Sequence, residues 1–234
     1  MSIITENFEV HEILNPKIWT ENNVLKPDVK QALLKIIEEF KSNLLIPLDI
    51  VDARIVGSNA SFNYTQYSDI DLHLIANFSQ LDDSTEILKA LYNSERSNFN
   101  KSYDIKVKGI DVEIYVEDLM DGNISNGIYS IFNDCWIKFP VRLDIPDETI
   151  DISEAVNKWE QNIRKNILNS NSEQLNKLLN NLYIMRKNSL EIDGEYGAGN
   201  QIFKEIRNRG LLDEMKDKIR ELRSQELTLE HLGW

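Results

Sequence analysis

The sequence is poor in cysteine and histidine, and it contains no long apolar run. Its 234 residues include one cysteine, Cys135, and three histidines, which excludes an intrachain disulfide and argues against a Cys/His zinc cluster. No segment approaches the ~20 apolar residues that span a bilayer, and residues 1–6 lack the features of a signal peptide. These absences predict a cytoplasmic protein with no membrane partner. Cys135 lies beside Trp136 in an apolar segment and is expected to be buried.

Positive charge is also scarce, and it is unevenly distributed. The 26 Lys and Arg residues oppose 39 Asp and Glu residues, for a formal net charge of −13. Residues 151–234 hold 13 basic and 14 acidic residues, so residues 1–150 hold 13 and 25 and carry a net charge of −12. Proteins bind duplex nucleic acid mainly by neutralising its phosphates. The composition therefore argues against broad duplex binding, and any basic groove is expected in the C-terminal half.

The two halves of the chain have different periodicities. Before residue 150, β-branched runs and alternating polarity predict strands, with a hairpin turn at Lys108-Gly109. The expected strands are 50–56, 68–76, 102–107 and 110–116, with 135–143 as a strand or a buried connection. The expected helices are 27–42, 82–93, 152–170, 172–190, 200–208 and 211–224. This pattern predicts an α/β (α+β) fold with a C-terminal helical domain, residues 151–234, separated from residues 1–150 near Pro146 to Ile150.

The residues that suggest chemistry lie at the end of one predicted strand and the start of the next. Gly57 has no Cβ, so the backbone can approach an anion there, and Ser58 adds a hydroxyl donor. After ten intervening residues, Asp69 and Asp71 are two apart on a strand and therefore share a face. Adjacent carboxylates repel each other unless a cation lies between them. Because Mg²⁺ binds one or two carboxylates together with phosphate oxygens, the pattern predicts Mg²⁺ or Mn²⁺ and a nucleoside triphosphate.

A third carboxylate usually completes such a site, and the segment 110–116 offers two candidates. Asp111 and Glu113 share one face by the same alternation. Glu113 is favoured because apolar Val112 and Ile114 flank it, whereas Asp111 is nearer the hairpin turn; the choice between the two stays open. Tyr115, on the same face, is a candidate either for stacking on a base or for a place at the rim of the core.

These motifs resemble the signature of the polymerase-β-like nucleotidyltransferase superfamily. The matching residues are Val56-Gly57-Ser58, the ten-residue spacer and Ser68-Asp69-Ile70-Asp71-Leu72. More narrowly, the chain resembles nucleotidyltransferase-like proteins of large tailed bacteriophages, in His11 to Pro16, Leu25 to Val29, Gly109 to Val116, Gly194-Glu195-Tyr196 and Phe203-Lys204. The superfamily resemblance implies a small mixed β-sheet nucleotidyltransferase core with a helical domain that closes over the nucleotide. It also implies that Lys204, in the helical half, binds the triphosphate.

Together these observations predict a metal-dependent nucleotidyltransferase that moves a nucleoside monophosphate from ATP or another triphosphate to an acceptor and releases pyrophosphate. The acceptor stays open among an RNA end, a small molecule, a protein and a second nucleotide, and the acidic first half suits a polycationic small molecule better than RNA. The alternative is a catalytically inactive nucleotide-binding regulatory or antitoxin-like protein. The expected catalytic and metal-binding residues are Asp69, Asp71 and Glu113, and the expected nucleotide-binding residues are Gly57, Ser58 and Lys204.

Overall fold

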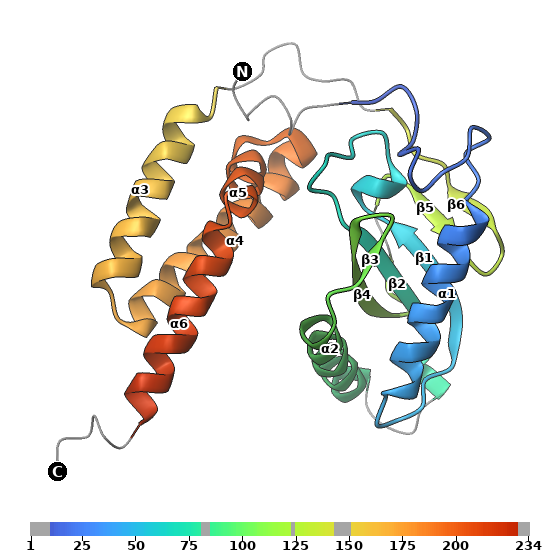
Figure 1. Cartoon of the computed structure of the whole chain (residues 1–234), viewed down its shortest axis with the longest axis horizontal. Helices are drawn as coiled ribbons and strands as arrows, with labels where there is room; N and C mark the ends of the chain where they lie inside the picture. The colour runs from blue at the N-terminus through green and yellow to red at the C-terminus, as the bar shows by residue number, and fades with distance from the viewer. Residues whose placement is uncertain (1–9, 81–84, 123–124, 143–150, 229–234) are drawn as a thin grey trace. The chain divides into compact units, whose positions relative to one another are not determined.

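The computed structural model describes residues 10–80, 85–122, 125–142 and 151–228 (Figure 1). The chain divides into two compact units, whose described parts are residues 10–142 and 151–228. The predicted boundary at Pro146 to Ile150 and the predicted helix start at 82–84 lie outside the described residues. The boundary at residue 150 therefore stays a prediction.

The first unit is built on a six-stranded sheet with the strand order β3-β4-β2-β1-β5-β6. Its strands are β1 Ile50–Val56, β2 Ile70–Ala76, β3 Lys106–Val107, β4 Ile110–Asp118, β5 Ile128–Ser130 and β6 Cys135–Lys138. Neighbouring strands are antiparallel except β2 and β4, which are parallel. Helix α2, Thr85–Ser102, lies on the crossover that a parallel pair requires. With the helices after residue 150, this mixed sheet confirms the predicted α+β class.

Helix α1, Pro27–Ser42, covers one face of this sheet (Figure 1). Pro27 occupies the first turn, where its missing N–H costs nothing. The buried residues of the helix recur at three- and four-residue spacing: Val29, Leu33, Ile36, Ile37 and Phe40. They share a core with alternate residues of the neighbouring strands β2 and β4: Ile70, Leu72, Leu74, Val112 and Ile114. Because side chains alternate along a strand, Asp71 and Glu113 project from the opposite face.

Helix α2 is longer than the sequence pattern suggested, and the predicted end near Asn93 is wrong. The helix continues to Ser102 because Phe99 is buried and packs edge-on against Phe40, with ring centroids 5.3 Å apart. Asn100 then bonds the backbone of Ile114, donating to its O at 3.1 Å and accepting from its N at 3.2 Å. Of the strand predicted over 102–107, Ser102 belongs to the helix, residues 103–105 have no regular structure, and only Lys106–Val107 forms β3.

The other edge of the sheet also differs from expectation. Strand β5 was not expected, and its three residues are all buried, without the alternation that marks a half-buried strand. Cys135 begins the edge strand β6 and is exposed, so the prediction of a buried cysteine is wrong. Its neighbour Trp136 is half-buried instead. Its Nε1 donates to the carbonyl oxygen of Asn23 at 2.7 Å, and its ring packs on Trp19.

The second unit is helical. It contains α3 Ser153–Asn169, α4 Ser172–Asp193, α5 Ala198–Asn208 and α6 Leu211–Leu227, with a 3₁₀ turn at Gly194–Tyr196. The N-terminus of α4 carries a capping box, in which Asn171 and Gln174 bond each other's backbone N–H. Within the described residues, no helix is long and apolar enough to cross a bilayer.

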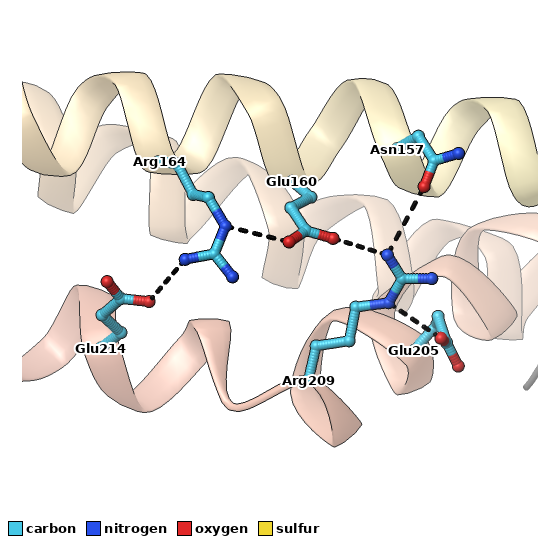
Figure 2. Close-up of polar contacts among 6 residues, drawn as sticks. All are labelled: Asn157, Glu160, Arg164, Glu205, Arg209 and Glu214. Carbon is cyan, nitrogen blue, oxygen red and sulfur yellow. Dashed lines mark hydrogen bonds and ion pairs between the residues drawn. The ribbon is translucent and has the colours of Figure 1, made fainter.

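An ionic network joins three helices of this unit (Figure 2). The guanidinium of Arg209 contacts Glu205 of α5 at 2.9 Å, through Nε, and Glu160 of α3 at 2.5 Å, through Nη1. Arg164 binds the other oxygen of Glu160 at 2.9 Å and reaches Glu214 of α6 at 3.5 Å. The side chain of Glu205 is fully buried. Its charge therefore depends on protein partners rather than on water.

Candidate active site

The parallel pairing of β2 and β4 sets the geometry of the predicted acidic site. Asp71 of β2 is the register partner of Glu113 of β4, and on its other side it pairs with Val56 of β1. Paired residues of neighbouring strands project from the same face. The structure therefore brings Asp71 and Glu113 side by side on the face that α1 leaves uncovered. Asp69 comes just before β2 and is half-buried.

Gly57 follows β1 and is held against this acidic pair. Its backbone, at φ 72° and ψ −158°, lies in a region that is essentially restricted to glycine. A Cβ at this position would lie 2.0 Å from Oδ2 of Asp71. The missing Cβ at Gly57 therefore leaves room for the carboxylate of Asp71, and the predicted approach of this backbone to a triphosphate stays a prediction.

Replacement of Gly57 by alanine is expected to disturb Asp71 as well as the backbone. Backbone strain of this kind costs about 1–3 kcal/mol, and the added methyl would also displace the Asp71 carboxylate. Gly194 offers a matched control, because it has φ 71° and ψ −158° but nothing within 4 Å of its Cβ position. Backbone strain should lower the melting temperature of both Gly57→Ala and Gly194→Ala. Metal-dependent nucleotide binding, measured by the rise in melting temperature on adding the ligand, should be weakened only in Gly57→Ala. Unchanged binding in Gly57→Ala would contradict this reading.

A buried hydrogen-bond network fixes the segment between Gly57 and Asp69. Asn59 is fully buried; its Nδ2 donates to the backbone oxygen of Asp69 at 2.7 Å, and its own backbone oxygen accepts from Nε1 of Trp19 at 2.7 Å. The hydroxyl of Ser58 donates to Oγ of Ser68 at 2.8 Å. Ser58 thus has a partner inside the loop. Sequence reasoning missed Asn59, since one asparagine in a short loop carries no pattern.

The two candidates for the third carboxylate have different surroundings. Asp111 is exposed and forms an ion pair with Lys106, its cross-strand partner on β3. Glu113 faces Asp71 and accepts a hydrogen bond at Oε2 from the hydroxyl of Tyr115, at 2.7 Å. The ion pair with Lys106 gives Asp111 a structural partner, whereas the register places Glu113 beside Asp71.

The electrostatics around Tyr115 reflect the same cluster of carboxylates. Burial is the largest of the effects that raise the pKa of the Tyr115 hydroxyl above its ordinary value. The hydrogen bond to Glu113 and the negative charges of Glu113, Asp71 and Asp69 raise it further. All three predicted carboxylates therefore oppose the ionisation of this one hydroxyl.

The donor chemistry of this cluster fits a hard divalent cation. Mg²⁺ binds carboxylate oxygens and commonly takes only one or two of them, with water and phosphate completing its shell. Asp71 and Glu113, side by side in register, supply such a pair. Among the described residues, however, no group of three His, Cys, Asp or Glu side chains lies close enough together to hold a metal ion. The pair fits Mg²⁺ shared with a phosphate better than a cage made of protein ligands alone.

Lys204, the sixth predicted site residue, lies in the second unit. It occupies α5 and is half-buried. The same helix packs closely on α4, because a Cβ at Gly199 would lie 2.9 Å from the Cβ of Ser189. The role of Lys204 toward a triphosphate stays a prediction.

Comparison with known proteins yields one similarity in structure. No protein-family model matches the chain, and no curated protein matches it. The chain is similar to a solved structure described as the STING-associated CdnE c-di-GMP synthase from Capnocytophaga granulosa. The match has 19% sequence identity, covers 87% of this chain and 84% of that chain, and has a TM-score of 0.26. Because that score is low, the function is inferred from this chain's own residues.

Proposed function

We propose that this protein is a metal-dependent nucleotidyltransferase. The observation that carries the proposal is the parallel register of Asp71 with Glu113, beside a glycine whose backbone approaches Asp71. Asp69 lies just before β2, two residues from Asp71, and adds a third carboxylate at the start of this strand. Neighbouring carboxylates on one sheet face are unfavourable unless a cation binds there. A nucleoside triphosphate chelated to Mg²⁺ brings that cation together with the phosphate to be transferred.

The transfer itself would proceed as follows. An acceptor oxygen attacks the α-phosphorus of the triphosphate, the bond from that phosphorus to the bridging oxygen breaks, and pyrophosphate leaves. Glu113 is the residue we assign to receive the proton of the acceptor hydroxyl, because it is the most exposed of the three carboxylates. Asp71 and Glu113 would hold Mg²⁺ or Mn²⁺ together with phosphate oxygens, with Asp69 as the third predicted carboxylate two residues before Asp71. When bound, the metal would activate the attacking oxygen and stabilise the leaving pyrophosphate.

The net charge of the first half of the chain bears on which kind of acceptor the protein would bind. Residues 1–150 carry a net charge of −12, and an acidic surface attracts cations and repels the phosphates of RNA. This supports a polycationic small molecule over an RNA end.

A labelled transfer assay tests the proposal. The protein would be incubated with Mg²⁺ or Mn²⁺ and each α-³²P-labelled triphosphate, together with an aminoglycoside, a tRNA, a second nucleotide or no acceptor. Incorporation of label that requires metal, with release of pyrophosphate, is the expected result. If a triphosphate binds but no label is transferred to any acceptor, the inactive nucleotide-binding alternative is favoured instead.

A further inference from the structure

Tyr115 contacts the acidic cluster but is not among the residues expected to bind metal or nucleotide. It lies two residues after Glu113 on β4 and therefore projects from the same face. Its hydroxyl donates to Oε2 of Glu113 at 2.7 Å. One of the two carboxylate oxygens of Glu113 is thereby held, and the other is left to face Asp71 or a ligand.

The ring of Tyr115 is itself held from two directions. On β2, the ring of His73 stacks against it, with centroids 4.7 Å apart and planes inclined by 29°. From α2, the guanidinium of Arg96 lies 4.6 Å from the ring centroid, within the range of a cation–π contact. His73 is fixed in turn, because its Nδ1 lies 2.7 Å from Oε1 of Glu117. These contacts also oppose the alternative in which Tyr115 stacks on a base, since His73 and Arg96 already pack on its ring.

A long, exposed side chain such as Glu113 needs this kind of support. A free glutamate loses rotamer entropy when it binds a ligand. A tyrosine that is already ordered by neighbours restricts the carboxylate before the ligand arrives. Hydrogen bonds to metal ligands act in this way, and their loss commonly weakens metal binding by about 10–100-fold.

We propose that Tyr115 is a positioning residue that orients Glu113 for the metal-bound nucleotide. This inference rests on the proposed function, because the proposed function assigns Glu113 to the site that binds the metal and the nucleotide. Tyr115 acts through its hydroxyl, while His73 and Arg96 hold the ring that carries the hydroxyl. Tyr115 contacts no reacting atom in this scheme.

The substitution Tyr115→Phe separates the hydroxyl from the ring. Phenylalanine keeps the contacts with His73 and Arg96 and removes only the hydrogen bond to Glu113. We expect the dissociation constant of Mn²⁺, measured by titration in the presence of a nucleoside triphosphate, to rise about tenfold, with an unchanged melting temperature. Transfer activity should be recovered at saturating Mn²⁺, so that the KM for metal changes and kcat does not.

Two comparisons make the test specific. Tyr103→Phe is the matched control, since the Tyr103 hydroxyl donates to Oε1 of Glu39 at 3.3 Å on the exposed surface of α1 and α2; it should bind Mn²⁺ as the wild type does. In a double-mutant cycle, adding Tyr115→Phe to Glu113→Gln should not raise the dissociation constant of Mn²⁺ any further, because both substitutions act on the same metal contact.

The outcomes distinguish the two proposals. If the wild type binds Mn²⁺ and nucleotide and Tyr115→Phe binds them equally well, the role of Tyr115 is wrong and the proposed function stands. The role of Tyr115 is also wrong if the losses of Mn²⁺ affinity from Tyr115→Phe and Glu113→Gln are additive in the double variant. If the wild type shows no metal-dependent nucleotide binding, both proposals are overturned.

Discussion

Replacing Glu113 by glutamine is expected to slow nucleotidyl transfer by about 10³-fold. Glutamine has nearly the same size and can still accept the hydrogen bond of Tyr115, but it removes the negative charge beside Asp71. Metal-assisted charge stabilisation contributes several kcal/mol to such reactions, and a loss of about 4 kcal/mol corresponds to about 10³ in rate. Single-turnover transfer of an α-labelled triphosphate measures the loss.

Asp111→Asn provides the matched control on the same strand and face. Because Asp111 forms an ion pair with Lys106 at the exposed β3 edge, its replacement should change the transfer rate by about twofold or less and stability by about 0–1 kcal/mol. The reverse result, in which Asp111→Asn abolishes transfer and Glu113→Gln does not, would assign the third carboxylate to Asp111.

Substitution of Arg209 by methionine is expected to destabilise the helical unit by about 3 kcal/mol. Methionine keeps an unbranched apolar side chain but removes the guanidinium from Glu205, whose side chain is fully buried, and from Glu160. Removing one partner of a buried ion pair commonly costs about 3–5 kcal/mol, because the remaining charge loses its compensation. Denaturant unfolding of the full-length protein, followed by circular dichroism, measures the change.

The control for this substitution is Arg220→Met on α6. Arg220 pairs with Asp217 at 3.4 Å, with both side chains largely exposed, and such surface pairs contribute about 0–1 kcal/mol. Equal effects of the two substitutions would contradict a stabilising role for the ionic network in Figure 2.

The same network predicts a dependence on pH. The hydrogen bonds from Arg209 and then Arg164 hold the pKa of Glu160 below its ordinary value of 4.5. The folded state therefore binds this proton less readily than the unfolded state. Its stabilising contribution is complete above that ordinary value and is lost as the pH falls through the lowered pKa. Arg209→Met should lose part of this acid dependence.

The elements that the sequence predicted well are those with strong local patterns. The apolar spacing of α1 and the alternation around Asp69 and Asp71 both indicate burial on one face. In a strand, burial on one face also fixes the register with its neighbours. The side-by-side placement of Asp71 and Glu113 follows from that register. The local sequence pattern could not show that β4 lies beside β2 or that the two strands are parallel, because strand pairing depends on the tertiary fold.

The features that the sequence did not predict depend on contacts between distant segments. The end of α2 depends on the packing of Phe99 against Phe40, and the exposure of Cys135 depends on its place at the edge of the sheet. Asn59 and Tyr115 act through hydrogen bonds whose partners become neighbours only after folding. Residue type alone gave no reason to select Asn59, and for Tyr115 it suggested base stacking rather than a hydrogen bond to Glu113.

Thermal unfolding with nucleotide and metal tests the central claim most directly, because it needs no acceptor. The wild type and the Asp69→Ala/Asp71→Ala variant would be heated with ATP, GTP, CTP or UTP, in the presence of Mg²⁺, Mn²⁺ or EDTA. A ligand at 100 times its Kd stabilises by about 2.7 kcal/mol, which raises Tm by several degrees. The account predicts this shift for at least one triphosphate, only with metal and only in the wild type. An equal shift in the variant or in EDTA, or no shift with any combination, would contradict it.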